Sequence, residues 1–270
     1  MENNKQAILL TGASGGVGFE VAKKFIAEGY VVFGLDVKEP GEQFDGFNFI
    51  KTDLTKSEDV ESAFNKVKES GYRLKAIINT AGRYDLNSLI EISEEEFIKI
   101  FNINVFSIYR TNKAFLPLLE KKGKIIMISS ELGPLDPLPF TGLYAITKST
   151  IEKYAYSLRM ELQLLDYQVV VIRPGAINTG LLEVSMDRLN SFTENTKYYT
   201  TNSQKFKKIV SSVENKKVPP QKISNLIYKV NEKKKPKYVY NINRNFSLRI
   251  LNILPKRLQN YIIKQILKAK

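Results

Sequence analysis

Tyr144 and Lys148 are the residues of this chain best suited to moving a proton. They stand in the segment YAITK, at the start of a long helical stretch. Residues four apart share one face of a helix, so the lysine ammonium can lie close to the phenol. A nearby cation favours the phenolate and lowers the pKa of tyrosine from about 10 toward neutral pH. The pattern is common by itself, and its weight depends on where the fold places it.

The composition removes most other routes to acid–base chemistry. The 270 residues include no histidine and no cysteine. This excludes a Ser-His-Asp triad, a histidine general base, thiolate nucleophiles, disulfides and metal sites built from these two residue types. Proton transfer near neutral pH must then use Tyr, Lys or a carboxylate with a shifted pKa, or a cofactor. We expect no metal.

The elements that would position such a pair follow from the first 180 residues. Short apolar runs, which predict buried strands, lie at 7–11, 30–35, 47–52, 75–80, 123–129 and 167–173. Stretches of helical spacing between and after them cover 17–28, 57–70, 94–119 (one or two helices) and about 144–166. This alternation indicates an α/β fold of the Rossmann type, a doubly wound parallel sheet with helices on both faces. Ligands bind such sheets at the carboxyl ends of strands, and Tyr144 follows the fifth run.

Several regions depart from this alternation. Residues 37–47 are short and rich in Gly and Pro, so the second crossover should lack a full helix. Residues 181–218 have the character of polar helical turns and are predicted to form a substrate lid. Pro219–Pro220 then opens another helix, PKYVY gives a last strand, and 241–270 forms a basic amphipathic extension. We expect one domain over residues 1–270.

A glycine-rich turn directly follows the first strand and opens the first helix, with the sequence TGASGGVG at 11–18. Its glycines, Gly12, Gly16 and Gly18 among them, suit a tight turn and close approach of the backbone to a pyrophosphate at the helix amino terminus. A phosphate-binding P-loop would need Lys and then Ser or Thr after the last glycine. Phe19 and Glu20 stand there instead, so the turn predicts a dinucleotide site.

Asp36 ends the second strand. A carboxylate at this place accepts hydrogen bonds from the ribose hydroxyls of adenosine and repels a 2′-phosphate, which favours NAD over NADP. Lys38 nearby keeps NADP open, and a solvated Asp before the turn at Pro40–Gly41 is the alternative interpretation.

Further segments complete the pattern. NTAG lies at 79–82, Ser129–Ser130 follow IIMI, and RPGAINT lies at 173–179. Together with TGASGGVG and YAITK, they resemble the classical short-chain dehydrogenases/reductases over residues 5–180, in the expected order and spacing. The resemblance implies a fold of about seven strands, an NAD(P) cofactor, and oxidation of an alcohol or reduction of a ketone. PKYVYN and the tail resemble, more loosely, retinol- and steroid-dehydrogenase-like members.

The resemblance also implies roles for individual residues. Tyr144 would donate or accept the proton, Lys148 would lower its pKa and bind the nicotinamide ribose, Ser130 would hold the substrate oxygen, and Asn104 would order a water. Ser130 lies 14 residues before Tyr144, one more than expected, and Ser129 is the stand-in. The implied cofactor contacts are Gly12, Ser14, Gly16, Val17 and Gly18 at the pyrophosphate, Asp53 and Leu54 at the adenine, Asn79, Ala81 and Gly82 at the central strand end, and Pro174, Ile177 and Thr179 in the last motif.

The charge of the chain is concentrated at its end. Residues 201–270 hold 18 Lys and Arg against two Glu, whereas residues 1–200 hold 23 basic against 26 acidic residues. A basic amphipathic helix can lie at the surface of an anionic membrane. The interpretation we favour is that the apolar stripe packs on the same chain or on a second subunit. No nucleic-acid-reading motif accompanies the charge, so no nucleic-acid partner is expected.

The lid and the loop 131–143 are rich in Leu and Phe, which would suit a lipophilic alcohol or ketone or would only pack the lid onto the core. Two other functions stay open: a non-catalytic nucleotide-binding regulatory protein with the same fold, and a nucleotide-sugar epimerase-like enzyme. No signal peptide and no transmembrane helix are predicted. We expect a cytoplasmic protein, at most peripheral to a membrane, and a homo-oligomer.

Overall fold

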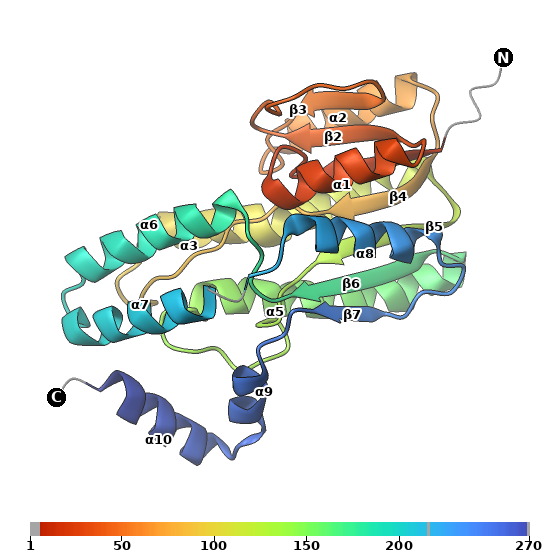
Figure 1. Ribbon diagram of the computed structural model, residues 1–270. Helices are drawn as coiled ribbons and strands as arrows, with labels where there is room; N and C mark the ends of the chain where they lie inside the picture. The colour runs from red at the N-terminus through yellow and green to blue at the C-terminus, as the bar shows by residue number, and fades with distance from the viewer. Residues whose placement is uncertain (1–5, 215–216, 269–270) are drawn as a thin grey trace.

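Seven parallel strands form the centre of the molecule, in the order β3-β2-β1-β4-β5-β6-β7 (Figure 1). The computed structural model describes residues 6–214 and 217–268. Of residues 181–184, 213 and 214 it describes the backbone only. The strands are β1 Ala7–Thr11, β2 Val31–Asp36, β3 Phe47–Lys51, β4 Leu74–Asn79, β5 Leu119–Ile128, β6 Gln168–Pro174 and β7 Val239–Ile242. The strand order reverses between β1 and β4, which is where a doubly wound sheet opens a crevice for ligands. The predicted Rossmann-type fold is confirmed.

Helices cover both faces of this sheet because its strands are apolar on both sides. Successive strand residues point to opposite faces. Ile8 and Leu10 face one core, together with α1 (Gly16–Ala27) and α8 (Pro220–Glu232). Leu9 faces the other core, with α2 (Ser57–Glu69), α4 (Ser107–Phe115) and α5 (Gly142–Leu162).

The connection from β2 to β3 runs through residues 37–46 without a helix, as the sequence predicted. Phe44 takes over part of the covering role that a helix would have. Its ring stacks on Phe47 with centroids 5.2 Å apart and meets Phe19 of α1 edge-on at 5.7 Å. The first crossover helix and this loop therefore cover the same face of the sheet.

The predicted helical stretch 94–119 is interrupted. It forms α3 (Glu94–Phe101), a π-helical turn at Asn102–Phe106, α4 and a short 3-10 turn at Leu116–Leu118. Ser93 caps α3 by accepting a hydrogen bond from the Glu96 N–H. The π-helical turn contains Asn104, and such irregular turns are frequent at functional sites.

The segment after β6 forms a lid of two helices, α6 (Gly180–Asn195) and α7 (Thr200–Glu214), which lie side by side beyond the end of the sheet (Figure 1). The lid has a small core of its own, built from Leu86, Phe140, Leu189, Phe192, Phe206, Val210 and Leu267. The predicted lid is thus more regular than a run of turns.

The carboxyl-terminal tail forms α9 (Phe246–Ile253) and α10 (Lys256–Leu267), and α10 lies against the lid (Figure 1). Leu267 inserts into the lid core, and the Asn202 side chain donates a hydrogen bond to its carbonyl. Part of the tail therefore packs on its own chain. None of the helices in the described ranges has the length and apolarity needed to span a bilayer.

Leu267→Ala tests this packing. Leu267 is 8% exposed, so its truncation should leave a cavity in the lid core and lower the free energy of unfolding by about 2–3 kcal/mol. Ile266→Ala is the matched control, because Ile266 is 51% exposed and should change stability by less than about 0.5 kcal/mol. Chemical denaturation measures both; equal effects of the two variants would contradict the packing described.

Candidate active site

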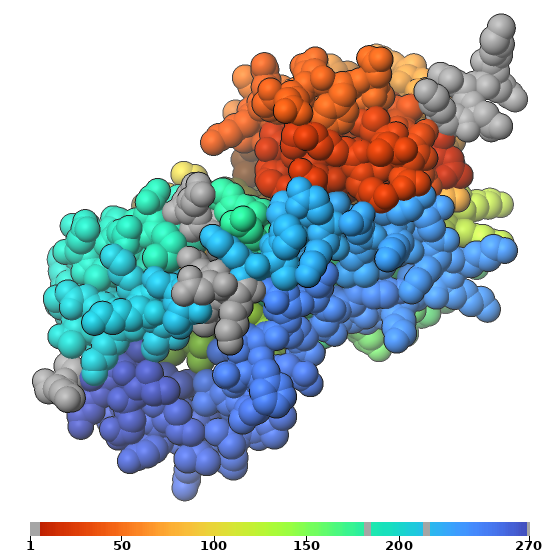
Figure 2. Space-filling view, viewed as in Figure 1, coloured from red at the N-terminus to blue at the C-terminus, as the bar shows by residue number. Residues whose placement is uncertain are grey.

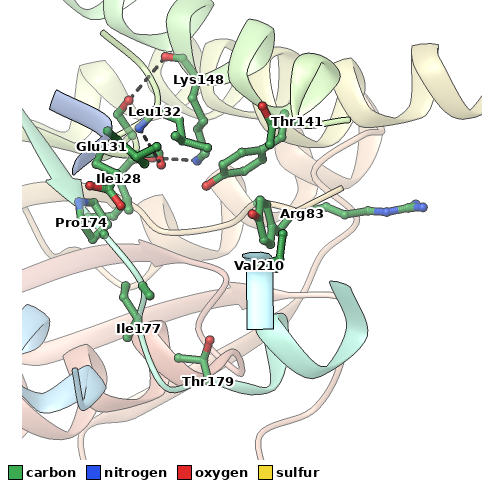
Figure 3. A pocket seen from close by; sticks show the side chains of 18 of the residues that line it. Arg83, Ile128, Glu131, Leu132, Thr141, Lys148, Pro174, Ile177, Thr179 and Val210 are labelled. Atoms are coloured by element: carbon green, nitrogen blue, oxygen red, sulfur yellow. Dashed lines mark hydrogen bonds between the residues drawn. The ribbon is translucent and has the colours of Figure 1, made fainter. Parts of the chain in front are cut away.

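A cavity of about 210 Å³ lies at the carboxyl ends of the central strands, between the sheet and the lid (Figure 3). It is formed by the start of α1, the ends of β4 to β6, the loop before α5 and the start of that helix, the lid, and α9. The predicted site residues that line it are Val17, Gly82, Ser130, Tyr144, Lys148, Pro174, Ile177 and Thr179. The fold therefore gathers around one space segments as far apart in the sequence as Val17 and Leu248.

Lys148 reaches from α5 toward the end of β5 and is almost fully buried. Its Nζ donates a hydrogen bond to the Ile128 carbonyl at 3.0 Å (Figure 3). A Cβ at Gly82 would lie 3.6 Å from this Nζ and 3.5 Å from Asn104 Oδ1, so both groups surround the bare glycine backbone. Burial lowers the pKa of Lys148 to about 8, although the Glu152 carboxylate acts in the opposite direction.

Tyr144 lies one helical turn before Lys148 and forms a side-chain hydrogen bond with Ser130. Its ring packs edge-on against Tyr84 at 4.5 Å, and Lys148 Nζ lies 5.6 Å from its centroid. Burial raises the pKa of Tyr144 to about 12; Ser130 lowers it and the Glu131 carboxylate raises it. The predicted net shift of this pKa toward neutral pH is therefore wrong for this geometry, because removing the phenol from water disfavours the phenolate more than its partners favour it. The role of Lys148 beside the phenol stays a prediction.

The two serines after β5 point in different directions. Ser130 reaches Tyr144, whereas the Ser129 hydroxyl donates to the Lys148 carbonyl at 3.4 Å. Ser130 Oγ also accepts a hydrogen bond from the Leu132 N–H at 3.2 Å. Of the pair, Ser130 is the one placed beside the phenol.

Asn104 is completely buried, and its side chain links two elements. Its Oδ1 accepts from the Arg83 N–H at 2.7 Å, and its Nδ2 donates to the Arg83 carbonyl and to Thr147 Oγ1. The amide thus fixes the backbone after Gly82 to α5. A role in ordering water stays a prediction.

The glycine turn packs too tightly for side chains at several positions. Gly12 has a φ of +67°, and a Cβ there would lie 2.7 Å from the Ala81 nitrogen. A Cβ at Gly18 would lie 2.0 Å from the Gly12 carbonyl oxygen. No side chain caps α1 at Gly15, so the helix amino terminus is left to the turn itself. Bare backbone at a helix amino terminus fits the pyrophosphate of a dinucleotide.

Asp36 is held against this turn. One carboxylate oxygen accepts from the Ser14 N–H at 3.0 Å and the other from the Lys38 N–H at 3.1 Å. Ser14 Oγ in turn donates to the Lys38 carbonyl at 2.6 Å. The carboxylate predicted to read the adenosine ribose therefore lies next to the turn predicted to hold the pyrophosphate.

The remaining predicted contacts do not line the cavity. Asp53 Oδ1 accepts hydrogen bonds from Thr55, and Leu54 packs in the core, both beyond the end of β3. Asn79 is buried and donates to Asn112 Oδ1 on α4 at 2.9 Å, and Ala81 adjoins the glycine turn. These residues surround the strand ends on the glycine-turn side of the cavity.

Several lining residues were not predicted as site residues. Leu248 of α9 forms part of the wall, and Glu131 accepts a hydrogen bond from the Asn245 N–H just before α9 at 2.6 Å. Arg83 borders the cavity, but its guanidinium points away and donates to Glu96 (Figure 3). No local pattern reveals these positions, since they depend on where the tail and the loops return to the sheet.

Comparisons with known proteins identify the class. A family model described as short chain dehydrogenase matches residues 6–189, so the chain belongs to the short-chain dehydrogenase family of oxidoreductases, which use NAD(P). The chain is 30% identical over 235 residues to a 3-ketodihydrosphingosine reductase of Bacteroides thetaiotaomicron, covering 86% of each. It is 34% identical over 192 residues to mouse estradiol 17-beta-dehydrogenase 2, covering 66% of this chain and half of that one.

Solved structures show the same fold. An aldohexose dehydrogenase of Thermoplasma acidophilum superimposes with a TM-score of 0.74 at 19% identity, covering 93% of this chain and 96% of that one. At this identity the likeness concerns the fold alone.

The buried ammonium predicts a pH-dependent stability. The pKa of Lys148 is about 8 in the folded chain and about 10.5 when unfolded, so between these pH values the folded chain has lost a proton that the unfolded chain still holds. Stability lost to this group at pH 7 should be regained as pH rises from 8 to 10.5. Lys148→Met removes the group, so its stability relative to the wild type should fall over that interval by about 3 kcal/mol.

Lys153→Met is the matched control, because Lys153 is exposed on the same helix. Its difference from the wild type should not depend on pH over this range. Urea denaturation at pH 7, 8.5 and 10 measures these differences, and a constant difference for Lys148→Met would contradict the burial of its charge.

Proposed function

We propose that the protein interconverts a lipophilic secondary alcohol and its ketone, using NAD in preference to NADP. The observation that carries the proposal is the grouping of Tyr144, Ser130 and Lys148 at one wall of a cavity whose other walls are mostly apolar. The glycine turn and Asp36 would hold the cofactor, with Lys148 near its nicotinamide ribose. The cofactor, when bound, supplies or takes up the hydride.

The side chains divide the rest of the chemistry. In the direction of reduction, Ser130 donates a hydrogen bond to the ketone oxygen and orients it. Tyr144 is neutral at pH 7, because its pKa is about 12, and can therefore give its proton to that oxygen as negative charge develops. The Lys148 ammonium then stabilises the phenolate until a proton from solvent restores it. In oxidation the same groups act in reverse.

Tyr144→Phe tests the proton-transfer role. The variant keeps the ring and its packing but loses the hydroxyl, so turnover should fall about a hundredfold or more. Binding of NADH, followed by its fluorescence, should stay within about twofold. Tyr156→Phe is the matched control, since Tyr156 is exposed on the same helix and should retain full activity. An active Tyr144→Phe would refute the proton-transfer role of Tyr144, whereas a wild type without turnover on any substrate would favour the non-catalytic alternative.

The cofactor preference rests on the Asp36 carboxylate. Its charge would oppose a 2′-phosphate, so Asp36→Asn should raise the ratio of kcat/KM for NADPH to that for NADH by about tenfold or more. Asp45→Asn changes an exposed carboxylate in the next loop and should leave the ratio unaltered. Solved structures of the same fold include a complex with 5-hydroxy-NADP and one with NADH. The preference of this chain is therefore read from its own ratio of kcat/KM values for the two cofactors. An unchanged ratio for Asp36→Asn would contradict the preference.

The first substrate to test follows from the relatives and from the walls of the cavity. One relative is named for a ketone on a long-chain base and another for a steroid alcohol. The cavity offers apolar contact to such molecules through Ile128, Leu132, Leu138, Phe206, Val210 and Leu248. We therefore propose 3-ketodihydrosphingosine first, followed by sterols and retinoids, read by the absorbance of NADH. A cytoplasmic location and a homo-oligomeric state stay predictions.

A further inference from the structure

One side of each tail helix packs against the rest of the chain. Leu248 of α9 lines the cavity, and Leu267 of α10 lies in the lid core. Asn252 and Lys256 both hydrogen-bond the Asp136 carboxylate in the loop before α5. These contacts fix the orientation of both helices, so deletion of the tail would expose the lid core and the cavity.

The outer side of the same helices is apolar and uncovered. Phe246, Ile250 and Ile253 repeat at i, i+4 and i+7 along α9, and Phe246 and Ile253 are 70% and 81% exposed. Leu248 is about 200° around the helix from Phe246, so the exposed row faces away from the cavity. On α10, Leu258, Tyr261 and Ile266 are also exposed. We call these six residues the outer row; the two helices that carry them form one end of the molecule (Figures 1 and 2).

The charge carried by the tail around the outer row is positive. Residues 233–270 contain 11 Lys and Arg and no Asp or Glu. Arg249 lies one residue before Ile250, and Arg257 and Lys264 border Leu258 and Tyr261 at i−1 and i+3. Exposed apolar side chains flanked by cations from the same helices suit an anionic lipid surface, which takes up the apolar groups and attracts the charges. A second copy placed on this face would bring two such cationic tails together.

The tail is also connected to the catalytic cavity. Glu131, the neighbour of Ser130, accepts a hydrogen bond from the Asn245 N–H at the start of α9. A second, mostly apolar groove of about 790 Å³ runs between α10 and the loops at 88–90 and 137–142. Leu138 lines both the groove and the cavity, so an alkyl chain leaving the cavity past Leu138 would enter a channel beside α10.

We propose that α9 and α10 dock the protein on an anionic lipid bilayer, with the outer row in the interface, and that lipophilic substrate passes between bilayer and cavity along α10. The passage of substrate rests on the proposed function, whereas the docking does not. Docking should weaken as ionic strength rises, since the attraction between exposed charges is screened.

The test is co-sedimentation of the full chain with vesicles of phosphatidylcholine, with and without phosphatidylglycerol, in the absence of substrate. The wild type should bind the anionic vesicles, and Phe246→Glu/Ile253→Glu should lower the bound fraction about tenfold or more. Leu164→Glu is the matched control, because Leu164 is 82% exposed and lies outside the tail, in the 3-10 turn Gln163–Leu165 that follows α5. This variant should bind as the wild type does. Arg249→Gln/Arg257→Gln, which alters no apolar contact, should also weaken binding.

Three results would overturn the proposal: equal, negligible binding to both kinds of vesicle; undiminished binding of both double variants; or a dimer in sedimentation velocity that Phe246→Glu/Ile253→Glu dissociates, which would assign the outer row to a second copy. If Phe246→Glu/Ile253→Glu loses vesicle binding but still turns over a short, water-soluble secondary alcohol at the wild-type rate, the result would support docking. Failure of turnover on every alcohol and ketone, with vesicle binding intact, would refute the proposed function and leave the docking standing.

Discussion

A single ammonium group, buried at the end of β5, constrains the whole site. Lys148 Nζ is held by the Ile128 carbonyl and lies against the bare backbone of Gly82. Burial of this charge opposes folding, and the lowering of its pKa from 10.5 to about 8 reflects the free energy that burial costs. The surrounding structure stabilises the arrangement through the sheet on one side and Asn104 on the other. Because the chain has no histidine or cysteine, this lysine and Tyr144 carry the proton chemistry we propose.

The pKa values of the pair suit reduction of a ketone near neutral pH. Burial keeps Tyr144 protonated, and Ser130 lies within hydrogen-bonding distance of it. A proton donor must hold its proton until negative charge develops on the substrate, and a phenol with a raised pKa does so. The apolar lid and Leu248 of the tail complete a cavity that favours lipophilic molecules over water. The exposed outer row of the tail, if it docks on a bilayer as proposed, would place this cavity next to a source of such molecules.

Local patterns in the sequence were enough to predict the sheet, the glycine turn and the helix that carries Tyr144 and Lys148. Strands such as β1 and β6 are short apolar runs, and the turn at 11–18 requires glycines where the backbone passes Ala81. Even the loop between β2 and β3 could be predicted, because its Gly and Pro do not support a helix.

Properties that depend on distant segments could not be predicted. Leu248 reaches the cavity only because α9 returns to the loop after β5, where Glu131 binds the Asn245 N–H. The raised pKa of Tyr144 depends on burial under Tyr84 and the lid, which a spacing of four residues does not show. For the tail, the sequence left open whether its apolar stripe packs on the chain or meets a membrane. In the structure one side packs on the chain, and the other side is exposed.

Direct transfer of hydride from the cofactor to the substrate carbon at this site can be followed with an isotope label. The wild type is incubated with 3-ketodihydrosphingosine and NADH that carries deuterium on both positions of nicotinamide carbon 4, and the lipid product is examined by mass spectrometry. The expected product is an alcohol with one deuterium at the carbinol carbon for each NADH oxidised. Oxidation of NADH with an unlabelled product, or no oxidation with this ketone or with any sterol or retinoid ketone or aldehyde, would contradict it.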